Sequence, residues 1–141
     1  MRDLPRQLSA DELAELFEGT TPLVERLAGL DDPLGRAREV AAGLTEADKR
    51  AVLDAHPAIG AKGLSARSAA EQGSGEAPEL AALNRAYEAR FGFRFVVFVD
   101  GRPKSEIVAV LKERLGRTRE QELATALDEL VAIAVDRWRR S

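Results

Sequence analysis

The residues best suited to chemistry gather in one stretch, "HPAIGAKGLSARSAAEQ", which holds the only histidine of the chain, His56. Ser68, Glu71 and Gln72 follow it. An imidazole moves protons near neutral pH, whereas a carboxylate and an amide hold polar ligands by hydrogen bonds. The stretch therefore predicts a polar pocket for proton transfer on a small molecule.

His56 stands at the end of a predicted helix, because a residue before a proline such as Pro57 is pushed out of the helical conformation. The free carbonyls of a helix end favour the charged imidazole, so we expect a raised pKa for His56. A surface histidine that only caps the helix remains the alternative.

Ser68 and Glu71 also have two interpretations. Ser-x-x-Glu is the signature of a capping box, in which the serine and the glutamate each accept a hydrogen bond from a backbone amide of the first helical turn. Here Gln72 and "GSG" follow instead of a long apolar run. The pair therefore indicates either a cap on a short helix or polar side chains directed at a ligand.

Arg137 is unusual among the arginines near the carboxyl end of the chain. It occupies the next position on an apolar helical stripe made of Leu123, Leu127, Leu130 and Ala134. A guanidinium on a buried stripe either reaches outward to solvent or meets an anion. A substrate anion is therefore one candidate partner.

The elements that must position these groups are predicted to be helices. Ser9 with Glu12 and Thr118 with Gln121 have the spacing of capping boxes, and glycines follow several apolar stripes. The helical stretches are 8–19, 20–30, 31–44, 45–55, 78–92, 104–116 and 118–140. With no repeat and no linker, residues 1–141 predict an all-α, single-domain multi-helix bundle.

One stretch, "FRFVVFVDG", has the composition of a strand followed by a turn. The sequence offers it no partner strand. We therefore expect a buried segment that is extended or irregularly helical, within an otherwise helical protein.

The composition excludes several classes of protein. The 141 residues are 45% hydrophobic and 32% charged, as in an ordinary soluble domain, and no apolar run is long enough to cross a bilayer. A net charge of −3 argues against nucleic-acid binding. With no cysteine and one histidine, we expect no disulfide, no metal site and a cytoplasmic protein without a signal peptide or peroxisomal address.

Five sequence features together are more specific than any of them alone. "HPAIG", "SAAEQ", "LNRAYEARFGFRF", "GRPKSEIVAVLKERLG" and Arg137 occur in this order. In this order they resemble the 2-oxo-4-hydroxy-4-carboxy-5-ureidoimidazoline (OHCU) decarboxylase family, over nearly the whole chain. The resemblance implies an all-α homodimer that converts OHCU to (S)-allantoin in urate degradation without a cofactor.

The resemblance also implies roles for individual residues. His56 and Glu71 match catalytic residues of the family. The residues implied to contact the substrate, partly through backbone groups, are Pro57, Ser68, Gln72, Phe95, Val96, Val97, Phe98, Val99 and Arg137. An association with hydroxyisourate hydrolase is a further implied partnership.

Three features depart from the family. Ala58 stands where relatives often carry Arg or Asp, "GTTPLVERL" lacks a Ser-Pro-Trp, and the spacing from His56 to Ser68 is short. These affect substrate fit and loop geometry more than the reaction. The alternative hypothesis is a non-catalytic helical module that binds a ligand or a partner.

Overall fold

The structure, a computed structural model, describes residues 3–57 and 78–141. This part of the chain contains seven α-helices and no strand, which confirms the prediction of an all-α protein. The helices are α1 (Ala10–Leu16), α2 (Pro22–Leu27), α3 (Pro33–Ala42), α4 (Glu46–Asp54), α6 (Pro78–Phe91), α7 (Lys104–Leu115) and α8 (Arg119–Arg140).

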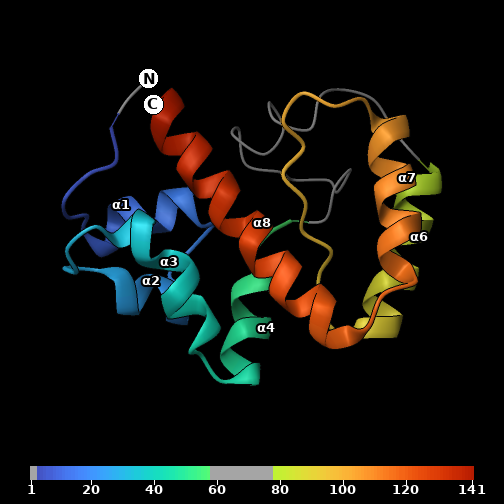
Figure 1. Cartoon of the computed structure of the whole chain (residues 1–141), viewed down its shortest axis with the longest axis horizontal. Helices are drawn as coiled ribbons and strands as arrows, with labels where there is room; N and C mark the ends of the chain where they lie inside the picture. Colours follow the sequence, from blue (N-terminus) through green and yellow to red (C-terminus); the bar gives the residue numbers. More distant parts are fainter. Residues whose placement is uncertain (1–2, 58–77) are drawn as a thin grey trace.

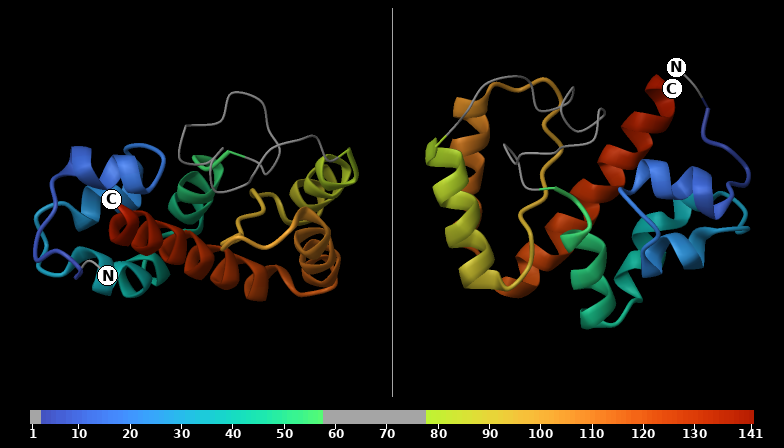
Figure 2. Two further views of the ribbon diagram at one scale, coloured as in Figure 1. Left: turned by 90° about the horizontal axis from the view of Figure 1, so that it is seen from above. Right: turned by 180° about the vertical axis from the view of Figure 1, so that it is seen from behind.

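The long helix α8 runs diagonally through the molecule and separates two groups of helices (Figure 1). Helices α1 to α4 lie on one side, where α1, α3 and α4 each pack on α8. On the other side α6 and α7 pack together. They run in the same direction, because the chain between them returns along their length (Figures 1 and 2).

The predicted helix ends lie within two residues of the observed ones, except that α1 and α2 end three residues before the ends of the predicted stretches 8–19 and 20–30. Local capping explains the agreement at the helix starts. Both capping boxes form: Glu12 N–H donates to Ser9 Oγ at 3.2 Å, and Gln121 N–H donates to Thr118 Oγ1 at 3.1 Å. The two reciprocal bonds, from each cap's backbone N–H to the Glu12 or Gln121 side chain, are 3.1 Å long. They satisfy amides that a helix start leaves without partners.

The hydrophobic core is continuous across α8, and one end of it is aromatic. Tyr87 packs against Phe91, Phe93 and Phe95, with ring centroids 4.7, 5.9 and 5.2 Å away. All four residues are buried. Tilted and edge-to-face contacts of this kind add to the free energy gained from burial. They attach the stretch after α6 to the α6 helix.

The predicted irregular segment is residues 94–99, an extended and mostly buried stretch between α8 and the α6–α7 pair (Figure 2). Side chains take the place of a partner strand. Arg114 Nη1 donates to the carbonyl of Val96 at 2.8 Å, and the Phe98 N–H donates to Glu129 Oε1 at 3.5 Å. Because buried backbone groups need partners, these bonds explain how a strand-like sequence is accommodated among helices.

A buried ionic network holds Arg114 in this position. Glu122 is fully buried, and its carboxylate accepts hydrogen bonds from Arg114 Nε at 2.7 Å and Arg117 Nη1 at 2.9 Å. The Tyr87 hydroxyl also donates to it, at 2.7 Å. One carboxylate therefore joins α6, α7 and α8 to the extended segment.

Candidate active site

His56 lies just beyond the end of α4, and its side chain is buried rather than exposed. The residue is only 4% exposed, and within the described part of the chain Nε2 has no hydrogen-bond partner. The alternative of a surface capping histidine is therefore wrong. A buried nitrogen without a protein partner is suited to meeting a ligand.

The direction of the His56 pKa shift also differs from the sequence expectation. The pKa of His56 is lowered from 6.5 to about 4, chiefly by burial. The positive charges of Arg137 and Arg94 contribute to the lowering, and the negative charge of Glu18 opposes it. The expected helix-end effect is outweighed because removing an imidazolium from water is costly. His56 is consequently neutral at pH 7 and able to accept a proton.

Arg137 is buried on α8 and does not reach outward to solvent. It is 3% exposed, Nη1 donates to the carbonyl of Leu16 at 3.0 Å, and Nη2 lies 2.9 Å from Glu18 Oε1. Of the two sequence interpretations, meeting an anion is therefore correct. The anion that the structure places there is a protein carboxylate.

Glu18 is a residue of this site that the sequence interpretation missed. It follows α1 with a φ of 62°, and its side chain is 14% exposed. The left-handed conformation is uncommon outside glycine and directs the chain at the end of α1. The sequence signal was indirect, because a buried arginine on α8 needs a nearby carboxylate. The packing of α1 on α8, which only the structure shows, makes Glu18 that carboxylate.

The segment predicted to contact the substrate is connected to His56 through Arg94. The Arg94 guanidinium donates to the carbonyl of His56, and Phe95 to Val99 follow directly. Phe95, Val96, Val97 and Val99 are buried, whereas Phe98 and Pro57 are half-buried. The structure therefore brings this segment and the His56–Pro57 turn into one region.

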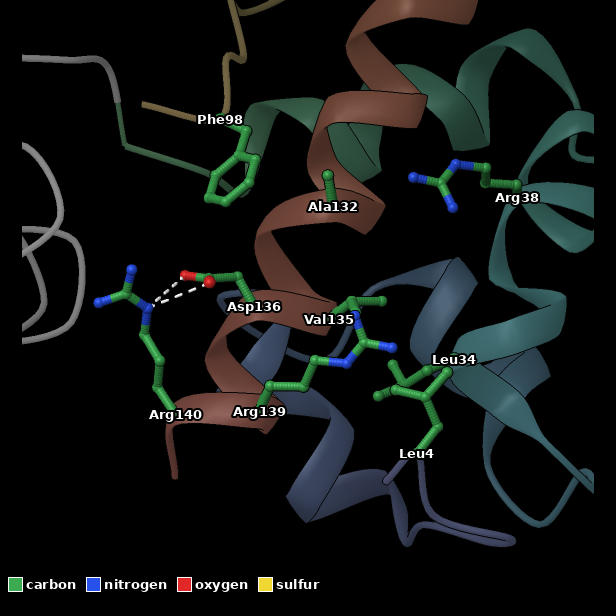
Figure 3. Close-up of a pocket in the computed structure, with 9 residues that line it drawn as sticks. All are labelled: Leu4, Leu34, Arg38, Phe98, Ala132, Val135, Asp136, Arg139 and Arg140. Carbon is green, nitrogen blue, oxygen red and sulfur yellow. Dashed lines mark hydrogen bonds and ion pairs between the residues drawn. The ribbon is translucent and has the colours of Figure 1, made fainter. Parts of the chain in front are cut away.

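Phe98 also lines a cavity of about 650 Å³ along α8 (Figure 3). The other lining residues are Leu4, Leu34, Arg38, Ala132, Val135, Asp136, Arg139 and Arg140. Neither His56 nor Arg137 is among them. This cavity is consequently not the pocket predicted around the histidine.

Ser68, Glu71 and Gln72 lie outside residues 3–57 and 78–141, so their predicted roles are not addressed by this geometry. In those two ranges no cluster of three or more His, Asp or Glu side chains could hold a metal ion. No helix there is both long and apolar enough to cross a membrane.

A buried neutral imidazole within the electrostatic influence of a buried arginine suits proton transfer on a small anion. Comparison with known proteins gives the family. The sequence profile of OHCU decarboxylase matches residues 2–139. The chain belongs to the OHCU decarboxylase family. It is therefore a carboxy-lyase of urate degradation.

Named OHCU decarboxylases are similar over most of the chain. The protein of Haloferax volcanii is 31% identical, covering 88% of this chain and 83% of its own length. The protein of Amia calva is 28% identical, and the match covers 89% of this chain and 85% of the Amia calva protein. The uric acid degradation bifunctional protein PucL of Bacillus subtilis is 32% identical over 95% of this chain, which spans only 30% of PucL.

Two solved structures are similar in fold to this chain. A crystal structure of OHCU decarboxylase in the presence of (S)-allantoin has a TM-score of 0.74 at 24% identity, covering 89% of this chain and 94% of that one. A crystal structure of (S)-allantoin synthase has a TM-score of 0.67 at 25% identity, and the match covers 91% of this chain and 47% of that one. The helical arrangement is therefore that of the OHCU decarboxylase family.

Proposed function

We propose that this protein decarboxylates OHCU to (S)-allantoin with its own side chains and without an organic cofactor or metal. The observation that supports this reaction best is the buried His56 imidazole, which is neutral at pH 7 and interacts electrostatically with Arg137. A neutral imidazole accepts a proton first and can return it later, as general acid–base catalysis requires.

The bond changes of this reaction need no external electron sink. When the bond from the ring to the carboxylate breaks, carbon dioxide leaves and the electron pair enters the adjacent carbon–nitrogen double bond of the ring. The hydroxyl loses its proton, and the ring carbon that carries the ureido group gains one. One further proton from solvent balances the charge on the ring nitrogen.

His56 would accept the hydroxyl proton and deliver a proton to one face of the ring carbon, which sets the (S) configuration. General acid–base assistance of this kind contributes roughly 10²–10⁴-fold in rate. Arg137 would orient the substrate anion, with Glu18 and the Leu16 carbonyl fixing the direction of its guanidinium.

The remaining assignments follow from the family resemblance. Glu71 would assist catalysis. Glu71 and Gln72 would hold the ureido and ring nitrogens, Ser68 and Pro57 would contact the substrate, and residues 95–99 would lie against the ring. The burial of most of that segment supports this role, because an apolar wall excludes water from the reacting centre.

The direct test generates OHCU in place, because the compound is unstable. Urate oxidase oxidises urate, and hydroxyisourate hydrolase hydrolyses the product to OHCU. Circular dichroism then follows the formation of optically active allantoin with and without this protein. We expect rapid formation of one enantiomer by the wild type and almost none by a folded His56→Asn variant. Slow, optically inactive allantoin from folded wild-type protein would instead favour a non-catalytic helical ligand-binding or interaction module.

We further propose that residues 1–141 form one domain and act as a cytoplasmic homodimer in association with hydroxyisourate hydrolase. The family resemblance supports the dimer, and a chain without cysteine suits a reducing compartment. The instability of OHCU supports close delivery by the preceding enzyme. Light scattering on the purified protein tests the dimer, which has twice the 15.3 kDa mass of one chain.

A further inference from the structure

Arg94 makes an unusual set of bonds at the end of α4. Its Nη1 donates to the main-chain carbonyls of His56 and, at 3.4 Å, of Asp54. Its own backbone N–H donates to Asp54 Oδ1 at 3.1 Å. On its other side, Nε donates to Glu88 Oε1 of α6 at 3.0 Å.

Two of these bonds reach main-chain carbonyls at and just beyond the end of α4, those of Asp54 and His56. The last carbonyls of an α-helix have no intrahelical donor, and a positive charge there interacts favourably with the helix dipole. The planar guanidinium presents its donors in a fixed geometry, and Glu88 restrains its orientation. The main chain at His56 is therefore fixed by a side chain from a distant part of the sequence.

We propose that Arg94 is a positioning residue that holds the His56 imidazole at a set distance from residues 95–99. The proposal rests on the decarboxylation proposed above. Arg94 immediately precedes the segment expected to contact the substrate ring, so one residue connects that segment with the proton-transfer group. Its side chain would not touch the substrate, and Glu88 would act only through Arg94.

Four variants separate positioning from general stability. Arg94→Gln removes both the positive charge and the planar set of guanidinium N–H donors, whereas Arg94→Lys keeps the charge. Glu88→Gln keeps Arg94 but weakens the bond that restrains the orientation of its guanidinium. Arg85→Gln is the matched control, because Arg85 is an exposed α6 arginine with no described hydrogen bond or ion pair. We expect Arg94→Gln to lower kcat roughly ten- to hundred-fold with KM changed less than about two-fold, since small misplacements of a reacting group have effects of this size.

Arg94→Lys and Glu88→Gln should give smaller decreases in kcat, and Arg85→Gln none. Nuclear magnetic resonance adds a readout independent of activity, because His56 is the only histidine and its imidazole signals need no assignment. In Arg94→Gln these signals should shift and the pKa of His56 should rise above about 4, because a nearby positive charge is lost. Arg94→Lys should leave the pKa nearer its wild-type value.

Wild-type kcat and wild-type imidazole signals in folded Arg94→Gln would overturn the positioning role. If that variant does not fold, Arg94→Lys and Glu88→Gln decide in the same way. An inactive wild type would instead refute the proposed decarboxylation, while the imidazole signals would still report whether Arg94 holds His56.

Discussion

Buried Arg137 and half-buried Glu18 form an ion pair, Nη2 to Oε1 at 2.9 Å, whose two charges act in opposite directions on His56. The guanidinium lowers the pKa of the imidazole and the carboxylate raises it. The pair joins the end of α1 to α8 near the residue expected to transfer protons. Its partners are 119 positions apart in sequence, so only the packing of α1 on α8 creates it.

A double-mutant cycle on this pair should separate its structural role from its role in binding. Arg137→Met removes the guanidinium that balances the charge of the Glu18 carboxylate, so we expect a loss of about 3–5 kcal/mol in the free energy of unfolding. Adding Glu18→Gln should recover part of that loss, because the charge that Arg137 balanced is then removed as well. Urea unfolding measures both values.

Activity should not recover with stability in the same double variant. If Arg137 orients the substrate anion, Glu18→Gln/Arg137→Met stays well below wild-type kcat/KM although it is more stable than Arg137→Met. Equal recovery of kcat/KM and stability would assign Arg137 a purely structural role.

The buried His56 should make stability depend on pH. The pKa of His56 is lowered from 6.5 to about 4, so between these values the unfolded chain binds a proton that the folded protein does not. The contribution of the neutral imidazole is fully present above pH 6.5 and is lost as the pH falls toward 4. At about 1.4 kcal/mol per pKa unit, the total is on the order of 3 kcal/mol.

His56→Asn isolates this effect from the titration of carboxylates, which both proteins share. Unfolding free energies of wild type and variant should be compared at pH 7.5 and pH 4. The wild type should lose on the order of 3 kcal/mol more than the variant. Parallel pH profiles would show that His56 is not desolvated in the folded protein.

The Glu122 network should contribute strongly to the position of the extended segment. Tyr87→Phe removes one of the hydrogen bonds to a fully buried carboxylate, so we expect a loss of about 1.5–3 kcal/mol. Glu122→Gln leaves Arg114 with a weaker partner and should cost more. The melting temperature and kcat should therefore both decrease in Glu122→Gln, because Arg114 also holds the Val96 carbonyl.

An unchanged melting temperature in Tyr87→Phe would show that the hydroxyl contributes no net stability. In Glu122→Gln, normal kcat with lower stability would show that the segment keeps its place without the network.

Glu71 should act in catalysis rather than as a helix cap. We expect Glu71→Ala, which removes any capping bond as well as the carboxylate, to lower kcat while changing stability by less than about 0.5 kcal/mol, as for substitutions away from structural features. Thr118→Ala is the matched comparison, because Thr118 forms a described capping box on α8. It should lose about 1 kcal/mol of stability and keep its activity.

Measuring kcat and the free energy of unfolding for the Glu71 and Thr118 variants decides between the two interpretations of Ser-x-x-Glu. A Glu71→Ala protein that loses about 0.5–2 kcal/mol and retains full activity would show that Glu71 is a cap.

Local features could be predicted from the sequence because local chemistry determines them. Thr118 and Ser9 begin helices through side-chain bonds within one turn, and Gly92, with a φ of 81°, follows the end of α6. The apolar stripe on α8 also predicted a core-facing position for Arg137, and the residue is buried there. Resemblance of ordered sequence features then indicated the family, which the comparisons confirm.

The tertiary structure alone decided the electrostatics of His56. Its neighbours in sequence suggested a raised pKa, whereas burial and the charges of Arg137, Arg94 and Glu18 determine the actual direction. Three of these four influences depend on residues far away in the chain. Desolvation and Coulomb interactions depend on distances in space, so no local pattern around "HPAIG" could give their balance.

The extended segment could likewise be predicted only in part from the sequence. Its composition, rich in Phe and Val, identified a buried stretch that does not fit a helix. Which groups would satisfy its backbone could not be read from the sequence, because Arg114 and Glu129 come from α7 and α8. Helix ends are therefore set by the sequence within a few residues, whereas the site forms only when distant helices pack and place their charges together.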